Sequence, residues 1–150
     1  MLAMRLVRLI ETHADQLSHG ITQRLKHDPH CADLRKVPSQ ELEARSYEVY
    51  RHLSDWLLYK TEGDLERIYT EIGARRARQG VAFSHVLYAM AATKELLWTF
   101  LQNEVAVTKP VELFGEMELY RVLDQFYDKA IFYIAEGYEH ARVREMAAAD

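Results

Sequence analysis

The sequence predicts an all-α protein, and three observations support this fold class. Apolar residues recur at steps of three and four along most of the chain, which is the spacing of one face of a helix. No proline falls between residues 39 and 109, and neither an Asn-Gly nor an Asp-Gly hairpin pair occurs. We therefore expect a five-helix bundle with a long C-terminal helix, or a globin-like packing of the same helices.

The first expected helix follows an apolar stripe that begins at Leu2 and continues to Leu25. It ends before Asp28 and Pro29, because proline removes a backbone donor and restricts the residue before it. Residues 28–38 are polar and bounded by prolines, so they are predicted to form a loop.

The second and third expected helices are separated by turn signals. Ser39 is predicted to be the N-cap of the second helix, and Gly63 is predicted to end it in a left-handed conformation. Asp64 is expected to cap the third helix, which runs to Gly80. Three cations in its last turns, Arg75, Arg76 and Arg78, suit the negative end of the helix dipole.

The last two expected helices are the most apolar. The fourth begins near Phe83 or Ser84, fades by Val107 and is closed by Pro110. The fifth extends from about Val111 to about Met146 and is apolar on more than one side. Such a helix is either central in a bundle or shared with a second chain.

Length and composition restrict the classes of function. The 150 residues suit a single domain, 1–150, and the 49% hydrophobic and 28% charged fractions are those of a globular protein. With 19 basic and 23 acidic residues the net charge is −4, which disfavours nucleic acid as a partner. The longest uncharged run, between Arg78 and Lys94, is too short for a membrane span. No signal peptide is evident and Cys31 is the only cysteine, so we expect a cytoplasmic protein.

A polar group is expected in or near the core. Lys94 lies in register with the apolar residues of its helix, and a buried ammonium needs an acidic partner. Asp124 and Asp128 are one turn apart and repel each other unless a cation lies between them. Lys94 and the pair Arg75 and Arg76 are the candidate cations. The group is either a structural brace or a ligand or switch site.

Aromatic residues are concentrated in the expected C-terminal helix. They are Tyr120, Phe126, Tyr127, Phe132, Tyr133 and Tyr138. Aromatics at helical spacing are usually core residues, but their presence on more than one face also suits a protein interface.

No cofactor site or catalytic site can be assembled from the sequence. No Glu-x-x-His pair, His-Glu-x-x-His motif, nucleophile elbow or phosphate loop occurs, so we expect a protein that is not an enzyme. His27, His30 and Cys31 cluster in the expected loop, yet one short segment rarely closes a four-ligand metal site. For haem, the candidate ligands are His13, His52 and His85, each of which is more simply explained as a hydrogen-bonded structural histidine.

The order of these segments resembles a known family. The resemblance rests on the Asp-Pro loop, on Ile68-Tyr69 leading to residues 73–81, on the apolar helix 87–100, on residues 123–130, and on Tyr133 and residues 137–139. Together they are similar to the N-terminal domain of RsbRD-type proteins, the RsbT co-antagonists of bacterial stress signalling, which is also found at the front of some bacterial histidine kinases.

The resemblance implies a sensory or regulatory domain. In related RsbR-type proteins this domain is globin-like without haem, dimeric, and joined by a helix to a C-terminal STAS domain. No such module follows here before Asp150, so the chain is expected to be either an excised domain or a stand-alone member.

Two functions follow as expectations. The first is a signal-input and dimerisation module of a stress-response or two-component regulator, with a protein partner and a C-terminal helix that passes the signal. The alternative is a globin-like sensor that binds haem or another small ligand.

Overall fold

The computed structural model describes residues 3–104 and 110–149, and these residues confirm the all-α prediction. In chain order the helices are α1 (Met4–Thr12), α2 (Ala14–His27), the 3-10 helix η1 (Pro29–Lys36), α3 (Ser39–Arg51), α4 (Leu53–Leu58), α5 (Glu62–Arg78), α6 (Phe83–Glu104) and α7 (Pro110–Ala149). No strand occurs within these two ranges. The expected end of the fourth helix at Val107 and the start of the first stripe at Leu2 lie outside the described residues.

Two of the expected helices are each divided by a histidine. The first is broken at His13, whose φ of −99° and ψ of 18° separate α1 from α2. The second is broken in the same way at His52, with φ −115° and ψ 31°, so α3 and α4 are distinct. Both breaks are too small to disturb the spacing of the apolar residues, which is why the sequence pattern does not reveal them. The expected loop 28–38 contains η1, which begins with Pro29.

The predicted helix caps around α3 and α5 are partly wrong. Pro38 is the N-cap of α3, and Ser39 is its first residue and makes no capping bond. Gly63 does not end a helix but lies in the first turn of α5. Thr61 caps α5 instead: its hydroxyl accepts from the Asp64 N–H at 3.2 Å, and the Asp64 carboxylate accepts from the Thr61 N–H at 2.9 Å.

The predicted stop at Gly80 is confirmed. Gly80 has a φ of +75°, a conformation that glycine adopts without steric cost, and it reverses the chain between α5 and α6. The turn is attached to α7, because the Tyr138 hydroxyl donates to the Val81 carbonyl at 2.6 Å.

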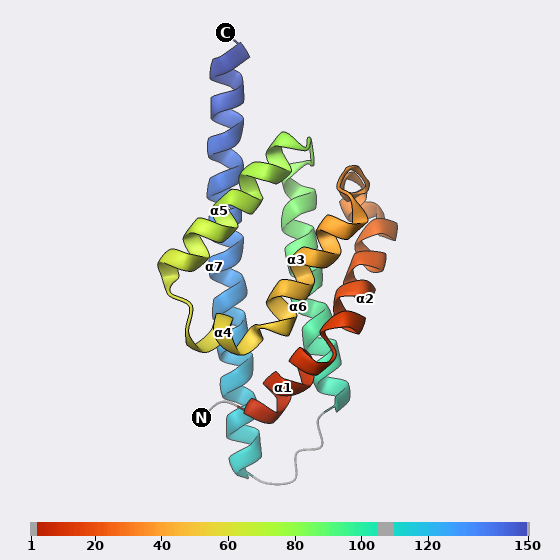
Figure 1. The fold of residues 1–150 in the computed structure, drawn as a ribbon, viewed down its shortest axis with the longest axis vertical. Coiled ribbons are helices and arrows are strands. Elements are labelled where there is room, and N and C mark those ends of the chain that lie inside the picture. The colour runs from red at the N-terminus through yellow and green to blue at the C-terminus, as the bar shows by residue number, and fades with distance from the viewer. Residues whose placement is uncertain (1–2, 105–109, 150) are drawn as a thin grey trace.

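The helix α7 extends the full height of the molecule, and α5 crosses it diagonally (Figure 1). Its 40 residues correspond to about 60 Å of helix. Two glycines allow this crossing: a Cβ on Gly73 would lie 2.0 Å from the Ile134 carbonyl oxygen, and a Cβ on Gly137 would lie 2.0 Å from that of Thr70. The two backbones are therefore in direct contact.

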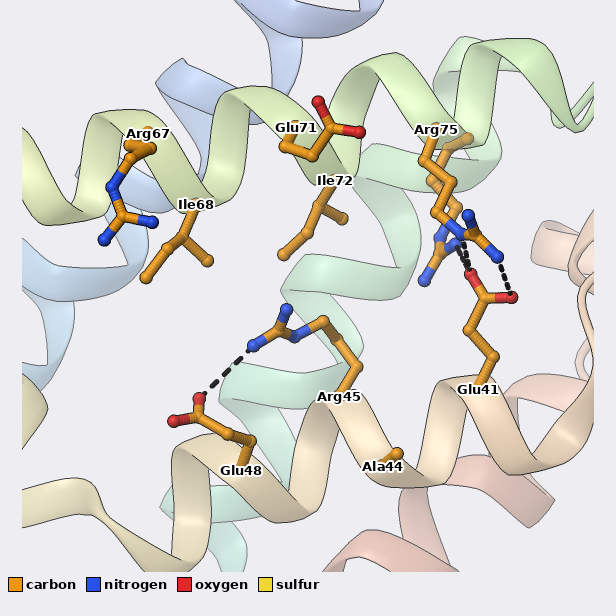
Figure 2. A pocket seen from close by; sticks show the side chains of 10 residues that line it. Glu41, Ala44, Arg45, Glu48, Arg67, Ile68, Glu71, Ile72 and Arg75 are labelled. Carbon is orange, nitrogen blue, oxygen red and sulfur yellow. Dashed lines mark hydrogen bonds and ion pairs between the residues drawn. The ribbon is translucent and has the colours of Figure 1, made fainter.

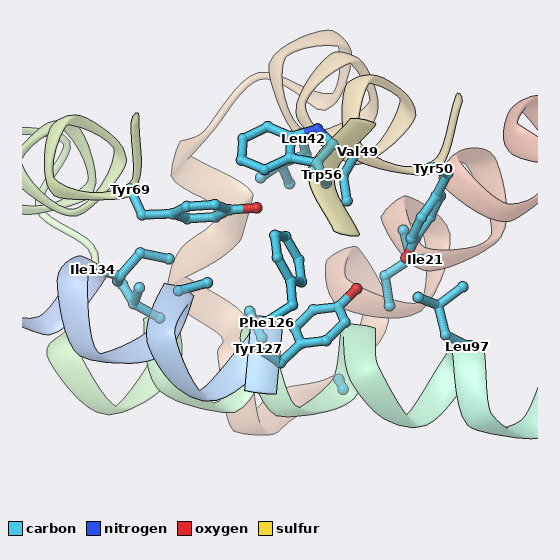
Figure 3. Close-up of a cluster of buried hydrophobic side chains, with 14 of the residues drawn as sticks. Ile21, Leu42, Val49, Tyr50, Trp56, Tyr69, Leu97, Phe126, Tyr127 and Ile134 are labelled. Carbon is cyan, nitrogen blue, oxygen red and sulfur yellow. The ribbon is translucent and has the colours of Figure 1, made fainter. Parts of the chain in front are cut away.

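The core lies between the α5–α7 pair and a second group formed by α1, α2, α3, η1 and α6 (Figure 1). Trp56, Tyr69 and Phe126 pack edge-to-face at its centre, with ring centroids 5.6 to 5.9 Å apart (Figure 3). None of the described helices is both long and apolar enough to cross a membrane.

Candidate functional site

An open groove with a volume of about 640 Å³ lies between α3 and α5. Facing residues on the two helices form its walls (Figure 2). From α3 they are Glu41, Ala44, Arg45 and Glu48, and from α5 they are Arg67, Ile68, Glu71, Ile72, Arg75 and Arg76. Steps of three and four place each set on one side of its helix. The groove is thus lined by charged residues around an apolar strip formed by Ile68 and Ile72.

Glu41 closes one end of the groove with an ion-pair cluster. Its carboxylate accepts from the Arg75 Nε at 2.5 Å and Nη2 at 3.0 Å, and from the Arg76 Nη1 at 2.7 Å. Gln79 donates to the same carboxylate. The hydrogen bond from Arg75 is the main reason that the pKa of Glu41 falls to about 2, and burial opposes this shift.

Arg76 is the buried member of this cluster, with only 5% of its surface exposed. Burial lowers the pKa of its guanidinium, and the bond to Glu41 opposes that effect. A buried cation without a partner costs several kcal/mol, on the order of the desolvation of one ion. Glu41 therefore balances the charge of Arg76 and joins α3 to α5.

Arg45 lies in the middle of the groove and is only partly satisfied. Its Nη2 donates to the Glu48 carboxylate at 3.2 Å, and the same oxygen accepts from the Trp56 indole N–H at 3.2 Å. The Arg45 Nε is buried and has no hydrogen-bond partner among the described residues. This donor is free to bind an acceptor that the chain itself does not supply.

Beneath the groove lies a smaller cavity of about 80 Å³. Arg45, Ile72 and Arg76 line both spaces. Most of the remaining lining is apolar: Leu25, Leu34, Leu42, Tyr69, Val86, Ala89, Met90 and Ile134. The groove thus has charged walls, and the adjacent cavity that shares three of its residues is mainly apolar.

Two further buried polar atoms lie in the core behind this cavity. The hydroxyls of Tyr50 and Tyr127 point toward each other without reaching hydrogen-bond geometry (Figure 3). Burial is the first cause of the raised pKa of both phenols and of Tyr69. These tyrosines are therefore neutral at any physiological pH.

The predicted polar group is divided between two places. Lys94 pairs with Asp124 at 3.4 Å, and both side chains are partly exposed. Asp128 is exposed and does not share this cation. Arg75 and Arg76 pair with Glu41 rather than with either aspartate. The Lys94 pair therefore fits a surface brace between α6 and α7.

The predicted interface aromatics are mostly core residues of one chain. Four of them, Phe126, Tyr127, Tyr133 and Tyr138, are 2 to 9% exposed. Tyr120 is partly buried and stacks on Trp98 with centroids 4.2 Å apart. Phe132 alone among the six is largely exposed, at 57%.

The candidate haem ligands have local structural partners or lie exposed. The His13 Nδ1 lies 2.8 Å from the Leu9 carbonyl oxygen, and the His85 Nδ1 accepts from the Asp33 N–H at 3.1 Å. His52 is exposed. No pair of them faces a common space among the residues that line the groove or the cavity.

The loop residues considered for a metal are also engaged. Cys31 is fully buried, and its thiol donates to the Leu25 carbonyl. The His30 ring lies 3.1 Å from the Asp28 carboxylate and stacks on Tyr88. His27 bonds to the Gln23 carbonyl. Across residues 3–104 and 110–149, no group of three His, Cys, Asp or Glu side chains could hold a metal ion.

Sequence reasoning did not identify Glu41 or Arg45 as site residues. Glu41 lies in the first turn of α3, where an acid also suits the helix dipole, and Arg45 lies between apolar positions of α3. The available sequence signal is the spacing of Glu41, Arg45 and Glu48, which places three charged residues on one face of α3. The facing residues of α5 are about thirty positions away in the sequence, so this spacing alone does not predict the groove.

Residues 15–150 match a family described as the RsbT co-antagonist protein rsbRD N-terminal domain. No curated protein and no solved structure matches the chain.

Proposed function

This chain belongs to the family of RsbT co-antagonist protein rsbRD N-terminal domains, and from this premise we propose that it is a signal-input and dimerisation domain of a stress-response regulator. Domains of this family are regulatory rather than catalytic. The proposed partners are a second copy of the chain and a protein of the signalling pathway, to which the family name points through RsbT. The single observation that carries the proposal is the form of α7.

The C-terminal part of α7 extends beyond the body of the molecule (Figure 1). The last buried residue of α7 is Ala141, and residues 142–149 are all exposed. These two turns of helix add no buried residue to the core. Their position suits a helix that connects the domain to whatever it controls.

The outward face of α7 carries exposed apolar side chains. Phe114, Phe132 and Val143 are 71%, 57% and 64% exposed. Phe132 lies about five helical turns after Phe114, and Val143 lies about three turns after Phe132, so the three share one face of α7. Phe132 lies nine residues, two and a half turns, from the buried Leu123 and from Ala141. The exposed apolar residues thus lie opposite the buried face, as in a helix shared with a second chain.

A signal in the domain can reach this helix through α5. The glycine contact leaves no space between α5 and α7, so a shift of α5 moves α7 with it. The groove, in turn, is lined by α5 on one side and α3 on the other. A change in the distance between α3 and α5 is therefore the proposed input, and a change in α7 is the proposed output.

Sedimentation equilibrium tests the dimer. We expect a mass twice the 17.5 kDa of one chain for the wild type. We expect Phe132→Asp to shift the equilibrium to monomer by at least about tenfold, since a charge on an apolar interface is desolvated without a partner. Tyr59→Asp is the matched control, because Tyr59 is a 75% exposed aromatic residue that is not part of α7.

Two results would contradict the proposal. One is a wild-type protein that stays monomeric at every concentration. The other is a dimer that Phe132→Asp and Tyr59→Asp affect equally.

A further inference from the structure

The groove and the cavity beneath it are adjacent and differ in chemistry. Arg45, Ile72 and Arg76 lie on the boundary between the two parts. The outer part, at about 640 Å³, has the size of a small-molecule site. The inner part, about 80 Å³, is lined mainly by apolar side chains and is small enough to favour one alkyl chain or ring.

Some of the charged groups around the mouth of the groove have hydrogen-bond partners within the described part of the chain, and one donor does not. Both guanidinium groups at the closed end, Arg75 and Arg76, are held by Glu41. Glu48 already accepts from Trp56 and from one nitrogen of Arg45. What remains is the buried Arg45 Nε, a donor without an acceptor. A buried donor left unsatisfied is destabilising, so an acceptor bound here supplies the missing hydrogen bond.

The net charge of the lining indicates the charge of the ligand. Four arginines (45, 67, 75 and 76) and three glutamates (41, 48 and 71) line the groove, so four positive and three negative charges leave one positive charge. A monoanion balances this charge, whereas a phosphate dianion meets three carboxylates that repel it. The planar fork of an arginine also suits a carboxylate.

We infer that the groove binds a small organic carboxylate, whose charged end lies on Arg45 and whose apolar end occupies the inner cavity. This inference rests on the proposed function, because it supplies the signal for the same α3–α5 groove. Such a ligand contacts Arg45 on α3 and Ile72 on α5, and therefore fixes the distance between the two helices.

Isothermal titration calorimetry of the full chain with hexanoate and benzoate tests the inference. Acetate lacks the apolar part, and 1-hexanol lacks the charge, so both are expected to bind at least about tenfold more weakly than hexanoate. Arg45→Met removes the donor while keeping the stem, and Ala44→Phe fills the mouth of the groove from an exposed position. The matched controls are Arg51→Met on the same helix and Ala91→Phe on α6, both at exposed positions that do not line the groove.

The expected result is hexanoate or benzoate binding that weakens at least about tenfold in Arg45→Met and Ala44→Phe, and that is unchanged in the two controls. Circular dichroism establishes that each variant is folded. No binding of either carboxylate to the wild type overturns the inference, and so does binding that neither groove variant weakens. Sedimentation of the same samples separates this failure from failure of the proposed function, because a dimer that binds no carboxylate leaves the dimer proposal intact.

Discussion

Glu41 is the residue on which the contact between α3 and α5 depends. Its carboxylate serves two arginines, one of them buried, and it has no substitute within the cluster. Removing the acid from a buried ion pair lowers the free energy of unfolding by more than the pair itself contributes, because the remaining cation stays buried without a counter-charge. A chain that senses through the distance between α3 and α5 would place such a residue at the end of the groove, where it limits how far the helices separate.

Glu41→Gln is expected to lower the free energy of unfolding by about 3 kcal/mol at neutral pH, because Arg76 loses its counter-charge. Urea denaturation measures this change. Glu43→Gln is the matched control: Glu43 lies on the same helix and forms a 3.8 Å contact with the exposed His19, so its effect should be within about 0.5 kcal/mol.

Glu41 also makes the free energy of unfolding depend on pH in the acid range. The folded-state pKa of Glu41, about 2, lies below its ordinary value of 4.5. A depressed carboxyl pKa contributes stability that is complete above the ordinary value and is lost as the pH falls toward the folded value. The difference between wild type and Glu41→Gln should therefore shrink between pH 4.5 and pH 2. A difference that is constant over that range would contradict the assignment.

At the scale of elements, the crossing of α5 and α7 is the most constrained contact in the fold. Gly73 and Gly137 each face a backbone carbonyl of the other helix, so no side chain lies between the two backbones and neither can come closer. Tyr138 adds a second link from α7 to the turn after α5 through the Val81 carbonyl. These contacts place the backbones of α5 and α7 directly against each other, as the proposed signal path requires.

Gly137→Ala is expected to destabilise the protein by about 3 kcal/mol, because its methyl group would meet the Thr70 carbonyl oxygen at 2.0 Å and the backbones must separate. Thermal unfolding followed by circular dichroism measures the change. Gly20→Ala in α2 is the control, since a Cβ there has no neighbour within 4 Å, and alanine in a helix should stabilise by about 0.5–1 kcal/mol. Equal effects of the two substitutions would contradict the account of the crossing.

The sequence predicts the elements better than it predicts their contacts. Helix periodicity, Pro29 and Gly80 correctly place the expected loop and the turn before α6, because these signals are local. The breaks at His13 and His52 were missed, since a small change of φ and ψ leaves the apolar spacing intact. Thr61 was missed as a cap because Gly63 is the stronger turn signal in isolation.

The site was less predictable than the fold for a physical reason. Gly73 and Gly137 are present in the segments that carry the family resemblance, yet nothing local shows that they meet. Glu41 and Arg76 have no recognisable motif, and their pairing depends on the packing of distant helices. The interface aromatics on α7 were predicted by composition, which cannot distinguish Phe132, on the outward face, from Phe126, on the inward face.

For the whole molecule, the central feature is that one helix belongs to both the packed body and the projecting end. The inward face of α7 completes the core, and its outward face and its last two turns are exposed. A dimer formed on the outward face with the two copies of α7 parallel would place these helices side by side and bring their C-terminal ends together, and this parallel arrangement is the one the proposed output requires. Val143 and Met146, both exposed apolar residues, lie on that projecting end.

The most direct test of this account is the distance between the two copies of residue 143. Val143→Cys, in a Cys31→Ala background, carries one spin label per chain, and pulsed dipolar spectroscopy measures the separation. We expect a single short distance, consistent with helix axes about 10 Å apart plus the length of the labels. A sample without dipolar coupling, or a distance comparable to the roughly 60 Å length of α7, would contradict the parallel dimer and with it the proposed route of the signal.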